Sequence, residues 1–316
     1  MRQTIWQFHI GGLTIPIYGF GLMLVIGFLL ASHLAKYLAR RNKLDGEVLI
    51  NAAMFGLIAG IVGARVSHIL ENLAEFTQPD VSGWDNFVNM INLTSGGLTY
   101  YGGFILATPV VVGYLLWKKF ALRLTADIVA PGLMIALGIG RIGCFLNGCC
   151  YGAESDLPWS VRFPYHSPAY IDQYAAHEIK PNPRLLEMNS SGRAHLRDPK
   201  TFENNPDLTK LAAAERSRAL HPTQLYSTIT ALLIAGIVFC YFTLRPAPGR
   251  VFAVMMILEG GTRFLLEMLR QEPAVAGRMS LSMIIGLIVL GTGVVLWMIF
   301  GRLAGQTQPS AIPATG

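Results

Sequence analysis

Five ionisable side chains interrupt long apolar stretches of this sequence, and they are the residues best suited to chemistry. They are Arg65, Arg141, Glu259, Arg263 and Glu267. A charged side chain at the centre of a membrane helix costs about 2.5–3.5 kcal/mol even on lenient insertion scales. Three unpaired arginines would therefore cost on the order of 8–10 kcal/mol, so the sequence predicts that a partner neutralises them.

The three arginines fall at similar positions in three separate apolar segments. Each lies about five or six residues from the end that we place on the outer side, so at about 1.5 Å per residue the three share one depth. Other segments begin at that level and bring polar side chains to it, namely Tyr18, Tyr101, Tyr226, His221 and Gln224. The sequence thus predicts one polar layer beneath the outer surface.

The segment that carries Arg263 has its own run of charges. Glu259, Arg263, Glu267 and Arg270 are spaced four, four and three residues apart, which places them on one helical face. Pairing within this helix could neutralise Arg263, but Arg65 and Arg141 have no acid in their own segments. Arginine binds phosphate in a bidentate manner, so a phospholipid headgroup is the anion that we expect at this depth.

The elements that must position these residues are membrane helices. Of the 316 residues, 52% are hydrophobic and 14% are charged, against about 25% charged in soluble domains. We predict an all-α integral membrane protein, a single membrane domain over residues 1–316 with about seven transmembrane helices. The expected spans are residues 15–35, 48–70, 99–117, 126–147, 223–243, 251–269 and 280–300.

Charge in the short loops predicts the orientation of these spans. Lys and Arg follow the first, third, fifth and seventh spans, whereas the loop at 72–98 has neither. By the positive-inside rule the N-terminus is periplasmic and the C-terminus cytoplasmic. We expect residues 153–221 to form a periplasmic head between spans four and five, with helical signals at 207–219, and residues 303–316 to form a disordered tail. Residues 1–14 lack the pattern of a cleavable signal sequence.

Three cysteines cluster after the fourth span, and their chemistry is open. Cys144, Cys149 and Cys150 have the spacing C-x4-C-C, with no second pair of ligands for a typical zinc site. A redox disulfide is an alternative, although adjacent cysteines form a strained bridge. The simplest interpretation is a set of small residues that closes a helix end, so we expect no metal or soluble cofactor. The formal net charge of +6 reflects loop charges, so we expect no nucleic-acid partner.

Several ordered motifs resemble those of the prolipoprotein diacylglyceryl transferase family. GRIGCFLNGCCYG at 140–152 is similar to the family signature, and DLPWSVRFP at 156–164 to the stretch that follows it. The further matches are IPIYGFGLMLVIGF at 15–28, GGLTYYGG at 96–103, HPTQLY at 221–226 and GGTRFLLEMLRQEP at 260–273. The resemblance runs from about residue 15 to residue 300 and agrees with the predicted order of spans.

This resemblance implies an enzyme of the bacterial inner membrane, with its active site towards the periplasmic leaflet. It would transfer the diacylglyceryl group of phosphatidylglycerol to the lipobox cysteine of a prolipoprotein signal peptide, releasing glycerol phosphate. It implies Arg141 as the arginine that binds phosphatidylglycerol and Arg263 as the essential arginine of the sixth span, with Glu267 and Arg270 at the acidic and basic positions that follow. We place Arg65, Tyr18, Asn147, Gln224, Tyr226 and Arg270 around the headgroup, and Arg141, Arg263, Tyr101 and Glu267 in catalysis.

The sequence departs from the family pattern at three positions. Tyr101 stands where well-studied members have a His proposed as the base, and Cys144 and Cys149 stand where the signature usually has Asn and Glu. A tyrosine with a pKa near 10 is a poor base, so we expect Tyr101 to donate a hydrogen bond and the proton acceptor is unassigned. Two alternatives follow: a relative with another acceptor or cysteine chemistry, and a non-enzymatic transporter or binding protein for an anionic lipid. The absence of an internal repeat disfavours the transporter.

Overall fold

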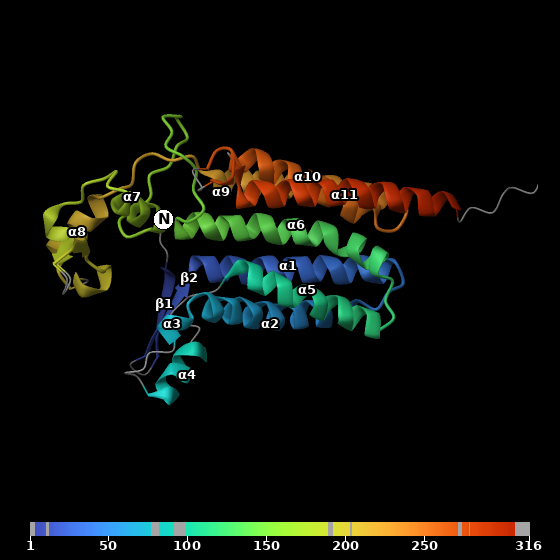
Figure 1. The fold of residues 1–316 in the computed structure, drawn as a ribbon, viewed down its shortest axis with the longest axis horizontal. Coiled ribbons are helices and arrows are strands. Elements are labelled where there is room, and N and C mark those ends of the chain that lie inside the picture. Colours follow the sequence, from blue (N-terminus) through green and yellow to red (C-terminus); the bar gives the residue numbers. More distant parts are fainter. Residues whose placement is uncertain are drawn as a thin grey trace, which may run out of the picture. The chain divides into compact units, whose positions relative to one another are not determined.

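The computed structural model describes residues 4–10, 13–76, 82–91, 99–188, 192–202, 204–270, 274–277 and 279–306. Long helices occupy each place where the sequence predicts a span (Figure 1). They are α1 (Gly19–Arg41), α2 (Gly46–Glu71), α5 (Tyr100–Trp117), α6 (Leu122–Asn147), α9 (Thr223–Thr243), α10 (Arg250–Glu267) and α11 (Leu281–Gln306).

Five of these helices are long and apolar enough to cross a membrane. They are α1, α2, α6, α9 and α11, the last over Leu281–Leu303. The helix α5 has 18 residues with Pro109 inside it, and α10, also of 18 residues, contains the charged positions of the sixth predicted span. The fold is therefore that of a helical membrane protein, whereas crossing by all seven helices stays a prediction.

The beginning of the first predicted span is wrong. Residues Leu13–Tyr18 form strand β2, which pairs with β1 (Thr4–Ile10) as an antiparallel hairpin, and α1 begins only at Gly19. Leu13, Ile15 and Ile17 alternate with other residues at a period of two, which is typical of a strand. The described residues are mainly helical, as predicted, with two further short hairpins, β3 (Leu186–Met188) with β4 (Ala194–Leu196) and β5 (Ala274–Ala276) with β6 (Met279–Ser280).

The chain divides into two compact units, where the sequence led us to expect one domain. One unit comprises residues 32–129, and the other comprises residues 1–31 and 130–316. In the unit of residues 32–129, α2 packs against α5 through glycines: a Cβ added at Gly63 or Gly102 would collide with the backbone of the other helix. This unit also contains the short helices α3 (Leu73–Phe76) and α4 (Gly83–Ile91), which lie in the predicted outer loop.

In the other unit, α6, α9 and α10 share a buried apolar cluster. Its members are Ala130, Met134, Ile234, Ala235, Val238, Val251 and Met255. The helix α10 also packs against α11, where a Cβ on Gly260 would lie only 2.6 Å from the carbonyl oxygen of Gly286. These contacts fix the helices that carry Arg141 and Arg263 against each other.

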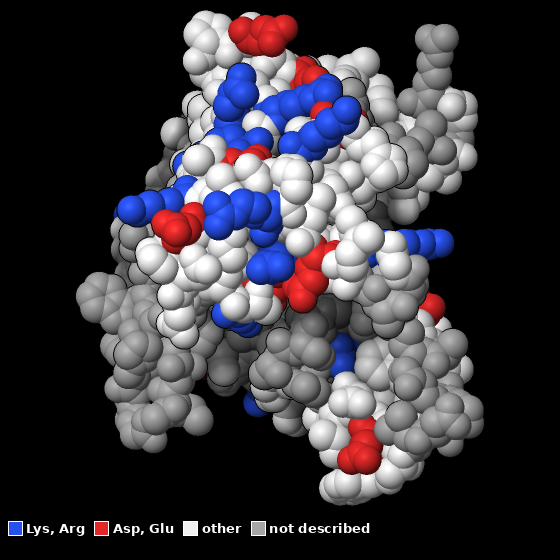
Figure 2. Space-filling view, turned by 90° about the vertical axis from the view of Figure 1, so that its left-hand side faces the viewer, with Lys and Arg blue, Asp and Glu red and all other residues white. Residues whose placement is uncertain are grey.

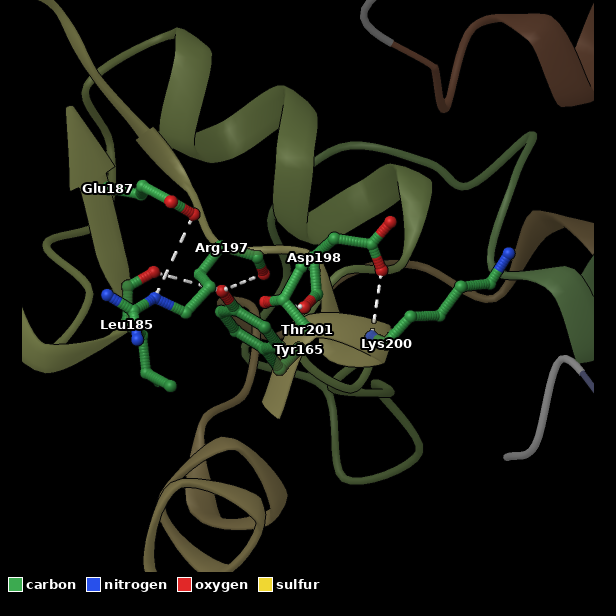
Figure 3. Close-up of polar contacts among 7 residues, drawn as sticks. All are labelled: Tyr165, Leu185, Glu187, Arg197, Asp198, Lys200 and Thr201. Atoms are coloured by element: carbon green, nitrogen blue, oxygen red, sulfur yellow. Dashed lines mark hydrogen bonds and ion pairs between the residues drawn. The ribbon is translucent and has the colours of Figure 1, made fainter. Parts of the chain in front are cut away.

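Residues 153–221, which we call the head, form a group of short elements, and their periplasmic location stays a prediction. They include α7 (Pro168–Ala175), η1 (Pro183–Leu185), β3 (Leu186–Met188), β4 (Ala194–Leu196), η2 (Pro199–Phe202) and α8 (Pro206–Ala214). Tyr165 lies in its core and donates hydrogen bonds to the carbonyl oxygens of Leu185 (3.1 Å) and Arg197 (2.8 Å) (Figure 3). Burial raises the pKa of Tyr165 to about 12, so its hydroxyl stays a donor at neutral pH.

The surface of this head carries both signs of charge. Lys and Arg side chains gather on it with Asp and Glu between them (Figure 2), and residues 153–221 contain nine of each kind. The segment is therefore formally neutral.

The base of the head is tied to the helices that flank it. Ala153 donates a backbone hydrogen bond to Leu269 after α10, and Gly152 donates one to His221 before α9, at 2.8 and 2.9 Å. The entry and exit of the head thus meet beside the ends of α6, α9 and α10. At the other end of the chain, α11 continues to Gln306, so the expectation of disorder at 303–306 is wrong, and the rest of that tail lies outside the described residues.

We expect the α2–α5 contact to tolerate no side chain at Gly102. Gly102→Ala should lower the free energy of unfolding by about 1–3 kcal/mol, because its Cβ would meet Ser67 and the carbonyl of Gly63. The matched change on the same helix, Gly113→Ala, meets no atom within 4 Å and should be neutral or stabilise by up to about 1 kcal/mol. Thermal unfolding of both purified variants in detergent measures the difference; equal effects would contradict this packing.

Candidate functional site

A narrow cavity lies among α6, α9 and α10, and three arginines line it. Arg141 comes from the last two turns of α6, Arg263 from α10, and Arg270 from the residues just beyond α10. The volume of the cavity is about 30 Å³, which is enough for a water molecule. The structure therefore brings Arg141 and Arg263 into one space, the arrangement that the sequence predicts.

The charges around this cavity do not cancel. Glu259 and Glu267 also line it, so three arginines and two glutamates leave a formal charge of +1. The carboxylate of Glu259 lies close enough to Arg263 and Arg141 to interact with both guanidinium groups. A single phosphodiester anion would complete the neutralisation.

Arg263 holds an unsatisfied donor inside this part of the chain. Its Nε atom is buried and has no hydrogen-bond partner among the residues that the structure describes. A buried donor without an acceptor costs about 1–3 kcal/mol. An anionic ligand in the cavity would supply such an acceptor.

Glu267 orients the basic side chain at the mouth of the cavity. Its side chain is only 5% exposed, and its Oε2 atom lies 3.3 Å from Nη1 of Arg270. Ser280, at the end of strand β6 (Met279–Ser280), donates a hydrogen bond of 3.3 Å to Oε1. Glu267 and Arg270, three residues apart in the sequence, therefore form an ion pair. The hydroxyl of Ser280, just before α11, also holds Glu267.

The sequence analysis missed a row of hydroxyl groups in the same cavity. Thr223, Ser227 and Thr230 of α9 line it, together with Thr262 of α10. The three α9 residues are spaced four and three apart, so they form a polar stripe along one face of a mainly apolar helix. This stripe was the signal in the sequence that could have revealed them. The hydroxyls of Thr223, Thr230 and Thr262 donate to backbone carbonyl oxygens, so their oxygens can accept hydrogen bonds from the hydroxyl groups of a ligand.

Arg65 has protein partners of its own. Its guanidinium donates to the carbonyl oxygens of Met90 (2.8 Å) and Asn89 (2.6 Å), and it lies over the ring of Phe76. These carbonyls belong to the last turn of α4, where a cation is favourable. Arg65 lies in the compact unit of residues 32–129, so a shared layer with Arg141 and Arg263 stays a prediction.

The remaining predicted site residues lie in varied surroundings. Tyr18 closes β2 and is 51% exposed, whereas the side chain of Tyr101, in α5, lies outside the described residues. Tyr226 accepts a hydrogen bond of 2.7 Å from the indole of Trp159 in the head. Gln224 is fully buried, and its Nε2 donates to the carbonyl oxygen of Cys149 at 2.7 Å. Gln224 thus supports the chain after α6.

The turn after α6 brings the three cysteines together. Asn147 ends the helix, and the Cys149 thiol donates to the carbonyl oxygen of Cys144 at 3.7 Å. The sulfur atoms of Cys144, Cys149 and Cys150 all lie within 4.8 Å of one another. Hydrogen bonds from the other two thiols, and more weakly the charges of Arg141 and Arg270, lower the pKa of the Cys150 thiol.

A second, wider cavity opens on the head side of this turn. Its volume is about 350 Å³, and Tyr151, Glu154, Asp172 and Glu178 are among the residues that line it. Cys150 and Arg270 line both cavities. The two cavities therefore share part of their lining at these two side chains.

Comparisons with known proteins agree on one family. Residues 6–299 match the family model described as prolipoprotein diacylglyceryl transferase. A phosphatidylglycerol–prolipoprotein diacylglyceryl transferase of Corynebacterium efficiens is 27% identical over 98% of this chain and 84% of its own length. Proteins of the same name from Corynebacterium diphtheriae and Clostridium tetani are each 28% identical, over 86% and 82% of this chain and 82% and 83% of their own lengths.

We expect Glu267→Gln to destabilise the protein through Arg270. Loss of the buried carboxylate charge should lower the free energy of unfolding by about 1–3 kcal/mol. The matched change, Glu47→Gln, breaks an ion pair with Lys36 in which Glu47 is 58% exposed, and should cost less than about 1 kcal/mol. Thermal unfolding in detergent compares the two, and a larger loss from Glu47→Gln would sink this assignment.

Proposed function

Because this chain belongs to the prolipoprotein diacylglyceryl transferase family, we propose that it transfers a diacylglyceryl group from phosphatidylglycerol to a prolipoprotein. The acceptor is the thiol of the lipobox cysteine, and the reaction is the first step of lipoprotein maturation. A sulfur–carbon bond forms, the carbon–oxygen bond to phosphate breaks, and the electron pair leaves with glycerol phosphate. The names of the relatives and the match over residues 6–299 support this reaction.

The observation that carries the proposal for the site is the arginine cavity. It combines a formal charge of +1 with a buried Nε–H of Arg263 that has no acceptor among the described residues. A phosphodiester supplies one negative charge and several acceptor oxygens. Both features are those that a phosphatidylglycerol headgroup would satisfy.

In this mechanism the arginines act on the leaving group. Arg141 and Arg263 hold the phosphate, and their charge stabilises the negative charge that grows on the departing oxygen. Glu267 orients Arg270, which approaches the phosphate from the mouth of the cavity. The hydroxyl groups of Ser227 and Thr230 bind the glycerol part of the headgroup.

Other predicted residues have supporting roles in this proposal. Tyr101 donates a hydrogen bond to the phosphate or to the leaving oxygen, and Tyr18 and Arg65 complete the headgroup site from the other segments. Asn147, Gln224 and Tyr226 hold the turn after α6 and the start of α9, and so set the edge of the site. No residue in this set is assigned as the base.

The arginine cavity must widen when lipid enters. At about 30 Å³ it has the room of one water molecule, which is less than a phosphate group needs. Rotation of the arginine side chains, which are long and only partly buried, provides the extra space. A site that is closed without substrate also limits reaction with water.

The membrane topology completes the proposal. Seven spans, with α5 and α10 as the third and sixth, place the N-terminus in the periplasm and the C-terminus in the cytoplasm of a bacterial inner membrane. The positive charge of the loops after α1, α5, α9 and α11 supports this orientation. Phosphatidylglycerol and the signal peptide then reach the site laterally, from the periplasmic leaflet.

Arg141→Ala should lower the transfer rate by at least about 10²-fold, because it removes a cation from the leaving group. Transfer is measured from labelled phosphatidylglycerol in mixed micelles to a lipobox peptide, with a Cys-to-Ser peptide as the blank. The matched variant is Arg123→Ala, an exposed arginine in the first turn of the same helix, which should keep the wild-type rate.

The same assay separates the alternatives. Headgroup binding by the wild type without transfer to any thiol peptide would favour a lipid-binding protein. Transfer to another acceptor but not to the lipobox peptide would favour a divergent relative. Equal rates for Arg141→Ala and Arg123→Ala would contradict the arginine site.

A further inference from the structure

The turn after α6 has a backbone that directs three thiols to one point. Gly148 and Cys149 both donate backbone hydrogen bonds to the carbonyl oxygen of Cys144, at 2.9 and 3.1 Å. Gly148 has φ +78° and Cys150 has φ 58°, and this left-handed conformation is uncommon for a residue with a side chain. The chain thus reverses within four residues and returns Cys149 and Cys150 to the end of the helix.

Side chains from α9 hold this turn in place. Gln224 donates to the carbonyl oxygen of Cys149 and Thr223 to that of Cys150, at 2.7 and 2.8 Å. Both donors are buried. These hydrogen bonds hold two consecutive carbonyls in place, and so they preorganise the turn that carries the three thiols.

The spacing of the sulfurs suits a metal site, and a bridge between the two adjacent cysteines is disfavoured. All three lie within 4.8 Å of one another, and tetrahedral zinc with bonds of about 2.3 Å holds its sulfur ligands about 3.8 Å apart. Small rotations of the thiols close that gap. The adjacent Cα atoms of Cys149 and Cys150 are about 3.8 Å apart, which is shorter than a disulfide normally spans.

We propose that Cys144, Cys149 and Cys150 bind a zinc ion whose fourth position takes the acceptor thiol. This inference rests on the proposed function and deepens it, because it supplies the activation of the nucleophile that the loss of the family His leaves open. Three protein ligands with one open position are typical of catalytic zinc. All three cysteines are partly exposed, and Cys150 lines both cavities, so a substrate thiol can reach the open position.

The surrounding charges suit a thiolate-rich zinc. Three thiolates and Zn²⁺ carry a net charge of −1, and the acceptor thiolate would make it −2. Arg141 and Arg270 lie near Cys150 and offset this charge. Soft sulfur ligands select zinc over the hard cations Mg²⁺ and Ca²⁺.

The step balances without an oxidant. A thiol that binds zinc is deprotonated, and its proton passes to solvent. The bound sulfur then attacks the glyceryl carbon, the sulfur–carbon bond forms, and the carbon–oxygen electron pair stays on the phosphate held by Arg141 and Arg263. Zinc is neither oxidised nor reduced, and the thioether product leaves it.

Metal content of the full-length protein tests the site first. After reduction, zinc loading and desalting in detergent, the wild type should retain about one zinc per chain by elemental analysis. Cys150→Ser should lose it, whereas Cys240→Ser, which changes the exposed free cysteine of α9, should retain it. Bound zinc should also protect Cys144, Cys149 and Cys150 of the wild type from alkylation, with Cys240 reacting in either state. This mapping needs no variant to fold.

Cobalt substitution tests the open position. The Co²⁺-loaded protein should show thiolate-to-cobalt charge-transfer absorption, and a lipobox peptide with its cysteine should change the cobalt spectrum. The same peptide with serine should not.

Three results would overturn the site itself. The first is that the reduced wild type retains no zinc, and the second is that Cys150→Ser and Cys240→Ser lose equal amounts of zinc. The third is that the protein is isolated with two of the three cysteines in a disulfide that prevents zinc from binding. Undiminished transfer by zinc-free protein would overturn the role in activation while leaving the proposed function intact. Zinc retention without any transfer from phosphatidylglycerol would instead overturn the proposed function.

Discussion

The need to neutralise guanidinium groups in apolar surroundings governs the arrangement of this protein. Arg65 meets that need with the carbonyl oxygens at the end of α4. Arg270 meets it with Glu267, which Ser280 also holds. Around Arg141 and Arg263 the described residues lack one negative charge for full neutralisation. Their cavity has a formal charge of +1 and a buried donor without an acceptor among these residues. The cavity that Arg141, Arg263 and Arg270 share is thus the place where the charges of the described residues do not cancel.

The site depends on how firmly the ends of three helices are joined. The apolar cluster of α6, α9 and α10 fixes the helix axes, and backbone hydrogen bonds from Gly152 and Ala153 tie the entry of the head to His221 and Leu269. Gln224 and Thr223 then bind the turn between them. The head, a segment of about seventy residues, is therefore anchored beside the helices that line the arginine cavity.

Local patterns in the sequence predicted the helices, the charged face of α10 and the shared cavity of Arg141 and Arg263. They failed where the partner is distant or made of backbone. Arg65 was placed around the headgroup and its protein partners were missed, because its carbonyl acceptors belong to α4, a helix within a loop read only for its lack of Lys and Arg. The first helix was begun too early, because the apolar character of Leu13–Tyr18 outweighed its strand-like alternation. The hydroxyl stripe on α9 was visible but ignored, since single Ser and Thr residues are common in membrane helices.

A transferase that uses a thiol must also prevent water from attacking the lipid in place of the thiol. The sizes of the two cavities suggest how water is excluded. The arginine cavity is narrow enough for about one water molecule, whereas the cavity beside the head is more than ten times larger. Cys150 and Arg270 line both. Under the proposed function, a peptide in the wide space and a phosphate in the narrow one would meet at these shared residues. Exclusion of water strengthens the electrostatic interactions between the arginines and the leaving group. A narrow arginine cavity therefore both protects the lipid from water and speeds the transfer.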